Sequence, residues 1–262
     1  MSFDDVTVIV LAGGYSRRFD NQIKALILYD SSTLLDHLLR KIDGVFDKIV
    51  ISVASEEVRK KLGEINYPVL VDKHPIPLHS LIEICGNLTT RYALIIPIDM
   101  PLLTLDHLST MLENISQYDL VSNLIEKNWV TSSCFAINIG NWDWQSVKTD
   151  LNQRQRLTDF IRYPKNIGLI ALSDPKILVN VNTKEDLEEI SMVQTHSESK
   201  FLHINPKIYL KSQDTRISNY RTEIDIWKGI SMHILSHIRY DVENDNLLNS
   251  DEKTELFKYI EL

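Results

Sequence analysis

The feature that most constrains the fold is the alternation of two patterns over about the first 190 residues. Short, continuously apolar runs rich in Val, Ile and Leu alternate with stretches of about ten residues in which apolar side chains recur at helical spacing. A continuously apolar strand suits a sheet that is covered on both faces, and a helix between successive strands joins them in parallel. The sequence therefore predicts an α/β protein, with a three-layer α/β/α arrangement around a mostly parallel, Rossmann-like sheet.

The clearest elements lie in the first 115 residues. We expect strands at 6–12, 48–54, 68–72 and 92–99, and helices at 33–42, 55–65, 79–88 and 105–115. In the first of these helices five apolar side chains share one face: Leu34, Leu35, Leu38, Leu39 and Ile42. Ser55 is the expected N-cap of the second helix, because its hydroxyl can accept a hydrogen bond from a backbone N–H of the first turn.

The patterns after residue 115 are less regular. Strands are expected at 119–124 and 132–138, and a helix at 155–163. The stretch 177–192 predicts a strand and then a helix. Thr183 is the expected N-cap of that helix, and Glu185 and Asp186 follow in its first turn, where carboxylates interact favourably with the helix dipole.

The polar stretch 193–205 loses this periodicity, and we expect a domain boundary there. Residues 1–194 are assigned to the main domain, and residues 195–262 to a linker and a small helical appendage. The appendage is expected to hold helices at 223–243 and 250–262, the second capped by Ser250. One stripe of the longer helix is apolar: Ile224, Trp227, Ile234, Ile238 and Val242. These helices are a candidate surface for packing on the main domain, for self-association or for a protein partner.

Composition and charge exclude several classes of protein. The chain has 262 residues, 44% hydrophobic and 24% charged, which is the balance of a globular protein. No stretch approaches the roughly 20 apolar residues of a membrane span. The net charge of −8 argues against nucleic-acid binding, which relies on basic residues. Asp4 and Asp5 precede the first apolar run, the reverse of a secretory signal, so we expect a cytoplasmic protein. Cys85 and Cys134 alone offer neither a disulfide framework nor a zinc knuckle.

The stretch VIVLAGGYSRRFDNQIKAL, residues 8–26, is the first candidate for chemistry. Gly13 and Gly14 follow a buried strand at its carboxyl end, where open α/β sheets bind ligands, and glycines let backbone N–H groups approach a phosphate closely. Three basic side chains follow: Arg17, Arg18 and Lys24. The pattern is neither GxxxxGK[ST] nor GxGxxG. These residues alone indicate either an ordinary tight turn or a phosphate loop, and we expect Arg17 to be solvated.

The whole string resembles the opening signature of the MobA-like nucleotidyltransferases, approximately LAGGxSxRxGxxKxL. The matching residues are Leu11, Ala12, Gly13, Gly14, Ser16, Arg18, Lys24 and Leu26. Two later segments occur in the order of that family: PIDMPLL at 97–103, and VNVNTKEDL at 179–187, which is close to the family's NxNTxEDL. The segment VLVD, residues 69–72, matches the strand whose terminal aspartate lies near the nucleotide. The resemblance covers about residues 6–192 and does not reach the C-terminal helices.

The resemblance implies a role for each matched residue. The nucleotide is expected to lie against Leu11, Ala12, Gly13, Gly14, Lys24, Asp72 and Asp99. The expected catalytic residues are Arg18, Lys24 and Asp99. Mg²⁺ is expected on Asp99 and Asn182, and the substrate on Asn180 and Asn182, which would share one face if they lie two apart on a strand.

The activity that the resemblance implies is nucleotidyl transfer from GTP to molybdopterin, which yields molybdopterin guanine dinucleotide. A phosphate of the acceptor attacks the α-phosphate of the nucleotide, and pyrophosphate leaves. Such a step depends on positioning and on neutralisation of charge. Relatives of the fold use CTP, or use sugar phosphates and other acceptors, and these stay open as alternatives.

Several positions depart from the family's pattern. Asp20, followed by Asn21, stands where the family usually has glycine, and Ile23 replaces a frequent acidic residue before the lysine. The turn that commonly reads GPLAG is IPLHS at 76–80. A phosphate loop that has decayed would leave a non-catalytic nucleotide-binding or scaffold protein, which is the alternative to an enzyme.

A second metal pattern lies outside the resemblance. His233 and His237 are four residues apart in the expected C-terminal helix, with Asp241 one turn further on, a spacing that suits metal ligands. No glutamate follows the first histidine, so the HExxH motif is absent. We interpret these residues as a solvated helical face.

Overall fold

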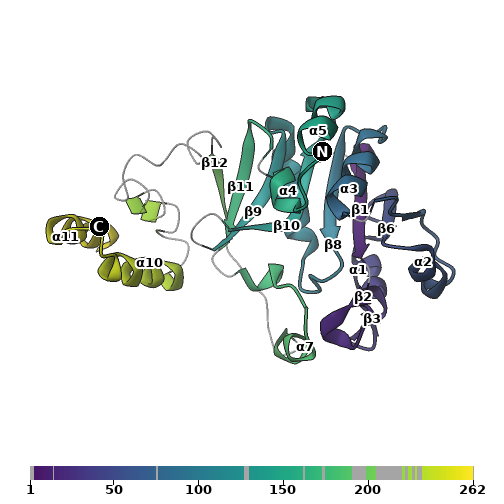
Figure 1. Ribbon diagram of the computed structural model, residues 1–262, viewed down its shortest axis with the longest axis horizontal. Coiled ribbons are helices and arrows are strands. Elements are labelled where there is room, and N and C mark those ends of the chain that lie inside the picture. The colour runs from purple at the N-terminus through teal and green to yellow at the C-terminus, as the bar shows by residue number, and fades with distance from the viewer. Residues whose placement is uncertain are drawn as a thin grey trace.

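One sheet organises the computed structural model, and its eight strands among the described residues run in the order β12-β11-β9-β10-β8-β1-β6-β7 (Figure 1). The structure describes residues 3–13, 15–74, 76–126, 130–161, 163–172, 175–190, 199–204, 220–221, 224–225, 228 and 232–261. The strands are β1 Val6–Gly13, β6 Lys48–Val53, β7 Val69–Val71, β8 Tyr92–Pro97, β9 Leu120–Glu126, β10 Val130–Asn138, β11 Ile167–Leu172 and β12 Ser199–Ile204. β1 pairs in parallel with β6 and β8, β6 with β7, and β9 with β11. Only β10 and β12 run antiparallel to their neighbours in this part of the chain, so the mostly parallel sheet is confirmed.

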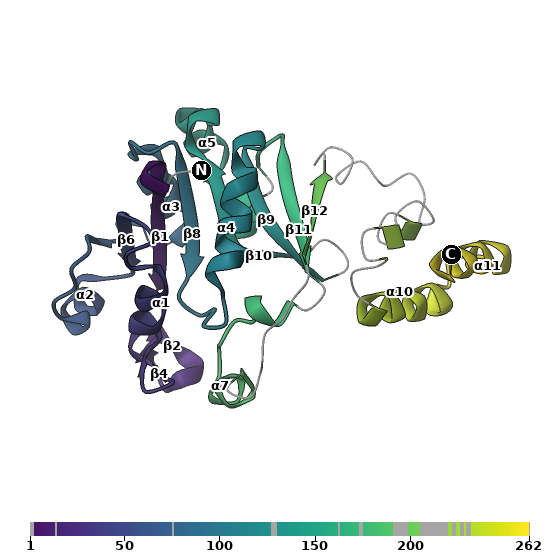
Figure 2. The ribbon, with the colours of Figure 1, turned by 180° about the vertical axis from the view of Figure 1, so that it is seen from behind.

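Helices lie on both faces of this sheet (Figures 1 and 2). They are α1 Leu34–Ile42, α2 Glu56–Leu62, α3 Pro77–Gly86, α4 Leu105–Asn114, α5 Trp144–Asp150, α6 Leu157–Ile161 and α7 Lys184–Ile190. The double covering buries every residue of β8 and most of β1, which is why these strands are apolar along their whole length. The predicted three-layer α/β/α arrangement is therefore confirmed.

Shorter elements connect these layers. The 3₁₀ helices are η1 Phe3–Asp5, η2 Arg17–Phe19, η3 Lys24–Leu26, η4 Ile115–Gln117, η5 Ile139–Asn141 and η6 Pro175–Leu178. Two small hairpins lie between β1 and α1, formed by β2 Tyr15–Ser16 with β3 Gln22–Ile23 and by β4 Leu28–Tyr29 with β5 Ser32–Thr33. The basic loop after β1 is therefore ordered into a hairpin and two 3₁₀ turns.

The helix starts follow capping chemistry. Ser55 caps α2 as predicted, because its Oγ accepts a hydrogen bond from the Val58 N–H. Thr33 caps α1 in the same way, and α1 buries the predicted face: Leu34, Leu35, Leu38 and Ile42. α3 begins at Pro77, two residues before its expected start, because proline suits the first turn of a helix, where its missing N–H is not needed.

The predictions failed around β11 and β12. Residues 177–181 were expected to be a strand, but they form the end of η6 and an irregular segment. The sheet is instead completed by β11, which no pattern predicted, and by β12, which pairs antiparallel with it at the edge. Because β12 begins at Ser199, the sheet extends past the boundary expected at residue 194. The N-cap prediction of the next helix is confirmed, since Thr183 Oγ1 accepts the Asp186 N–H at 3.2 Å.

The C-terminal helices pack mainly on one another and lie beyond β12, to one side of the sheet (Figures 1 and 2). They are α10 Met232–Asn244 and α11 Ser250–Glu261. Within the expected helix over 223–243, the described residues 224–225 and α10 are helical. Of the predicted stripe, Ile224, Ile238 and Val242 are buried, and the side chains of Trp227 and Ile234 lie outside the described residues.

The cap of α11 is Asn249 rather than Ser250. The Asn249 Oδ1 accepts the N–H groups of Asp251 and Glu252, each at 3.0 Å, so the helix begins one residue after the amide that caps it. Within the part of the chain that the structure describes, no helix is long and apolar enough to cross a membrane.

The place of β12 in the sheet predicts how the chain tolerates truncation. A chain that ends at Pro206 should keep its main domain folded, with cooperative unfolding in urea. A chain that ends at Gln194 loses β12 and leaves β11 as an open edge, so its free energy of unfolding should fall by on the order of 2–4 kcal/mol. Equal stability of the two truncated chains would show that β12 contributes nothing to the sheet.

Candidate functional site at the carboxyl edge of the sheet

The site is built at the edge where parallel strands end. β1 ends at Gly13, Asp72 follows β7 directly, and Asp99 lies two residues after β8. Parallel strands bring these carboxyl ends to one edge, which is where open α/β sheets bind ligands. Gly13 has φ +59°, in the left-handed region that favours glycine, so the chain can turn sharply as it leaves the sheet.

The residues before this turn are mostly inaccessible. Ala12 is fully buried, main chain included, so it offers a ligand no surface in this structure. Leu11 is half-buried, and its carbonyl accepts the Ile98 N–H at 3.2 Å, which ties β1 to the segment that carries Asp99. Gly14 and the side chain of Arg17 lie outside the described residues.

Three of the predicted site residues meet at one point. Lys24 Nζ donates to Asp99 Oδ2 at 2.6 Å and to Asn182 Oδ1 at 3.0 Å. The side chains of Lys24 and Asp99 are only 16% and 19% exposed, so the ion pair is shielded from water on most sides. This contact joins segments that are 75 and 158 residues apart in the sequence.

The backbone around Asn182 is locked onto Asp99. The Val181 N–H donates to the Asp99 carbonyl at 2.7 Å. Asp186 accepts the N–H groups of Asn182 and Thr183 at 2.6 and 2.8 Å, and the bond from Asn182 is the main cause that lowers the pKa of Asp186. The positive charge of Arg18, which is itself exposed, adds to that lowering of the pKa. The start of α7 therefore holds Asn182 in place beside Lys24.

Asn180 was expected to share a strand face with Asn182. The structure has no strand here among the described residues: Asn180 is exposed in an irregular segment, and its carbonyl accepts Asn182 Nδ2 at a long 3.4 Å. The prediction of a strand was wrong, because three apolar side chains of 177–181 are buried without a place in the sheet, whereas Val179 is exposed. Ile177, Leu178 and Val181 are buried there.

The phosphate loop is left-handed at Asp20, where the family usually has glycine, and at the next residue. Asp20 and Asn21 have φ +51° and +59°, the left-handed region that glycine adopts freely. Among other residues, aspartate and asparagine tolerate that region best. The Asp20 carboxylate accepts from Lys184 Nζ at 3.1 Å, with side chains 77% and 62% exposed. The negative charge of Asp20 is therefore paired with Lys184 and largely solvated. This pair was not predicted, because Lys184 lies 164 residues away.

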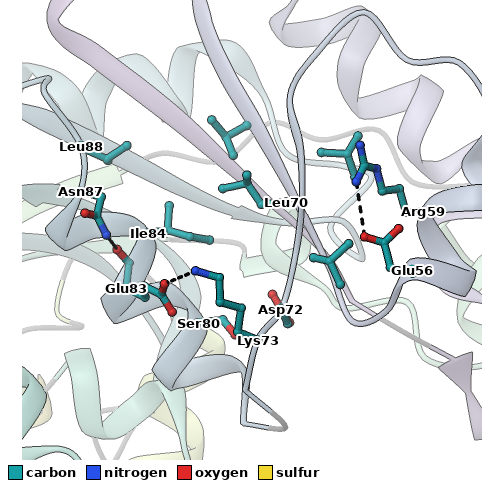
Figure 3. A pocket seen from close by; sticks show the side chains of 13 residues that line it. Glu56, Arg59, Leu70, Asp72, Lys73, Ser80, Glu83, Ile84, Asn87 and Leu88 are labelled. Carbon is teal, nitrogen blue, oxygen red and sulfur yellow. Dashed lines mark hydrogen bonds and ion pairs between the residues drawn. The ribbon is translucent and has the colours of Figure 1, made fainter.

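Asp72 lies at the end of a groove along the edge of the sheet. Ser52 Oγ donates to its Oδ1 at 2.5 Å, and burial raises the pKa of the Asp72 carboxyl. A cavity of about 660 Å³ runs beside β7, between α2 and α3, and includes Asp72. In Figure 3, Lys73 and Glu83 form an ion pair at 2.6 Å next to Asp72.

The altered turn at 76–80 has its own anchor. His79 Nε2 donates to the Arg154 carbonyl at 3.1 Å, and the rings of His79 and His74 meet edge to face with centroids 5.8 Å apart. His74 Nε2 also lies 3.2 Å from Glu83 Oε2. These contacts tie the start of α3 to the loop after α5. Sequence reasoning noted the altered turn but had no signal for the partner at Arg154.

The central residues fit a hard cation. Asp99 Oδ1 is buried and has no hydrogen-bond partner, so no bond to the protein offsets the loss of water from this oxygen. A carboxylate and an amide oxygen are the ligand types that Mg²⁺ prefers, and Mg²⁺ commonly takes one or two carboxylates and completes its shell with water and substrate phosphates. The described residues contain no group of three or more His, Cys, Asp or Glu suited to a metal, so the cation would take its further ligands from water or a substrate. His237 is exposed, and the side chain of His233 lies outside the described residues.

The sheet order and this edge define the class of an α/β nucleotidyltransferase. The chain belongs to the family of the MobA-like NTP transferase domain, whose model matches residues 8–160. The structure neighbours include molybdopterin-guanine dinucleotide biosynthesis protein A from Archaeoglobus fulgidus, with a TM-score of 0.55 and 16% identity over 70% of this chain and 95% of that one. A 4-diphosphocytidyl-2C-methyl-D-erythritol synthase from Anaerococcus prevotii has the same TM-score, with 11% identity over 71% and 94% of the chains. These likenesses concern the fold.

Sequence relatives carry a consistent name. A protein of Shewanella loihica named molybdenum cofactor guanylyltransferase is 27% identical over 73% of this chain and 98% of its own length. One of Shewanella sediminis with the same name is 25% identical over 71% and 95%. Both matches span nearly the whole relative, and this chain is the longer one.

The left-handed backbone at Asp20 predicts a graded response to substitution. Asp20→Ala should lower the free energy of unfolding by about 1 kcal/mol, because alanine pays the full cost of φ +51°. Asp20→Gly should not lower it, since glycine adopts this region freely. Lys184→Ala is the control for the ion pair and should change stability by less than about 0.5 kcal/mol. Urea unfolding measures all three, and equal tolerance of alanine and glycine would contradict the backbone explanation.

Proposed function

We propose that the protein is a Mg²⁺-dependent guanylyltransferase that joins GMP from GTP to molybdopterin and releases pyrophosphate. The observation that carries the proposal is the meeting of Lys24, Asp99 and Asn182 at the carboxyl edge of the sheet. These residues come from three separate motifs of the family resemblance. The shared name of the relatives supports the choice of GTP and molybdopterin.

The proposed reaction needs binding and neutralisation rather than a side-chain nucleophile. The backbone of the loop after β1, with Arg18 and Lys24, would hold the triphosphate, and Asp99 and Asn182 would hold Mg²⁺. When bound, Mg²⁺ would neutralise charge on the reacting phosphate. An oxygen of the molybdopterin phosphate forms the new bond to the α-phosphorus of GTP, and the bond from that phosphorus to the pyrophosphate breaks. Lys24 would stabilise the charge that gathers on the leaving pyrophosphate.

Lys24 must change partners for this to happen. Its ammonium contacts Asp99 Oδ2 and Asn182 Oδ1, the two side chains proposed to hold the metal. Two cations that share these oxygens would repel each other strongly in a site this shielded. A triphosphate offers the ammonium a new anionic partner. We therefore infer that Lys24 moves from Asp99 to the nucleotide as Mg²⁺ binds.

Asp20 is compatible with this proposal. Its partner Lys184 and its high exposure reduce its repulsion of a triphosphate, and the loop keeps the backbone shape that glycine would give. The alternative of a non-catalytic nucleotide-binding scaffold with a decayed loop therefore loses its main argument.

A second candidate is transfer of another nucleotide, such as CMP from CTP, or transfer to another acceptor such as a sugar phosphate. The altered turn 76–80 favours it, because this turn is where the family commonly reads the base and His79 anchors it to Arg154. Incubation with each of the four labelled triphosphates, Mg²⁺ and molybdopterin, with pyrophosphate as the readout, distinguishes the candidates. Of the four triphosphates, only GTP should support a release of pyrophosphate that depends on molybdopterin.

The extent of the catalytic unit is also a proposal. We assign residues 1–204 to the transferase, because β12 belongs to its sheet. The helices α10 and α11 would then serve a protein partner or self-association. We propose the cytoplasm as the site of the reaction.

Asp99→Asn should lower the rate of pyrophosphate release at least about 10²-fold, because the charge that holds Mg²⁺ is lost. Its free energy of unfolding should fall by only about 1–2 kcal/mol, for the lost bond to Lys24. Asp106→Asn is the control, an equivalent change at an exposed aspartate of α4. An Asp99→Asn protein that keeps most of its activity would overturn the proposed role.

Lys24→Met should separate the two proposed tasks of the ammonium. GTP affinity in EDTA, measured by calorimetry, should fall at least about tenfold, because a point charge on the phosphates is lost. Mn²⁺ affinity without nucleotide, measured by electron paramagnetic resonance, should rise, because Asp99 and Asn182 are freed. Lys60→Met, at an exposed position of α2, should change neither. Weaker Mn²⁺ binding by Lys24→Met would contradict the exchange of partners.

A further inference from the structure

Two side chains of α1 hold the loop that follows Asp99. Lys41 Nζ donates to the carbonyls of Pro101 and Leu103, the second at 3.0 Å. His37, one turn earlier, donates from Nε2 to the same Pro101 carbonyl at 3.1 Å. The matching residues of the family resemblance include neither of them.

The position of Lys41 is costly for an ammonium group. Lys41 lies three residues after Leu38 and seven after Leu34, on the apolar face of the helix, and burial lowers its pKa to about 8. A lysine at helical spacing with buried leucines could have pointed to this position, but Lys41 was not predicted from the sequence. Such a residue is retained where its hydrogen bonds matter more than the cost of removing its charge from water.

The segment from Asp99 to Thr104 needs this support. It lies between the end of β8 and the start of α4, so neither strand nor helix hydrogen bonds fix its backbone. Its anchors are the bond from Val181 N–H to the Asp99 carbonyl and a turn from Leu103 N–H to the Met100 carbonyl at 3.2 Å. The bonds from Lys41 and His37 add the connection to α1.

We infer that Lys41, assisted by His37, is a positioning residue that holds the backbone of 101–103 and so keeps the Asp99 carboxylate at the metal position. The inference rests on the proposed function for its metal. It makes α1 part of the site through the backbone of 101–103, which Lys41 and His37 bind. Partners that orient a metal ligand from outside typically change metal affinity 10- to 100-fold when they are removed.

The test compares Lys41→Met with Lys48→Met. Lys48 also donates from Nζ to a backbone carbonyl, that of Asp4 at 2.9 Å, but at an exposed position of β6. In Lys41→Met, amide hydrogen exchange across residues 98–104 of the ligand-free protein should quicken about tenfold. Mn²⁺ affinity in the presence of GTP should weaken about tenfold, while GTP affinity in EDTA stays unchanged. Lys48→Met should alter none of these measurements. Lys41→Arg should keep both the exchange rate and the Mn²⁺ affinity near their wild-type values, because the guanidinium still offers N–H donors to the two carbonyls.

The outcomes separate the inference from the proposed function. Unchanged exchange at 98–104 in Lys41→Met overturns the positioning role whatever the protein binds. Faster exchange without weaker Mn²⁺ binding confines Lys41 to stability and also overturns it. If wild type binds no Mn²⁺ with GTP, the proposed function fails, whereas the exchange result still decides whether Lys41 holds the loop. Should Lys41→Met not fold, His37→Leu removes one donor to the Pro101 carbonyl and must quicken exchange at 98–104 for the inference to stand.

Discussion

The ion pair of Lys24 and Asp99, with Asn182 as a third member, is the interaction on which the rest of the site depends. It closes three distant segments around one point at the carboxyl edge of the sheet. A partly buried ammonium and carboxylate are expensive to leave apart, because each would lose water without gaining a partner. The side chains of the site are therefore already in place, and their charges already neutralise each other. A triphosphate with its metal would have to replace the Lys24–Asp99 ion pair by two new pairs, one between Lys24 and the phosphates and one between Asp99 and the metal.

The surrounding elements supply the rigidity that this contact requires. β1 and β8 are parallel neighbours, so the basic loop and the segment after β8 leave the sheet side by side. Capping of α7 by Thr183 and Asp186 fixes the backbone of Asn182, and the carbonyl of Asp99 is bonded to Val181. The donors of α1 bind the carbonyls of Pro101 and Leu103, after Asp99. The backbone at Asp99 and Asn182 is thus bonded to other segments of the chain.

Two of the departures from the family's pattern differ in their physical effect. Asp20 stands where the family usually has glycine, and it and the following Asn21 are residues that tolerate a left-handed backbone, while Lys184 offsets the added charge. The change at Asp20 conserves shape. The turn at 76–80 is different, because His79 connects it to the loop after α5, and Ser80 of this turn also lines the groove that includes Asp72. Differences in what the protein binds are more naturally sought at this turn than in the phosphate loop.

The sequence by itself determined the layered α/β fold and the order of its early elements, because continuous apolar strands and amphipathic helices are local patterns with one favourable packing. It also identified Lys24, Asp99 and Asn182, through motifs, as members of one site. Only the tertiary structure decided which atoms meet, that residues 177–181 leave the sheet, and that β12 joins it. The tertiary structure alone also revealed that Asp20 is paired with Lys184, His79 with the Arg154 carbonyl, and Lys41 with the Pro101 carbonyl. Such contacts join residues far apart in the chain, and no local periodicity encodes them, because they arise from how the completed layers bring loops together.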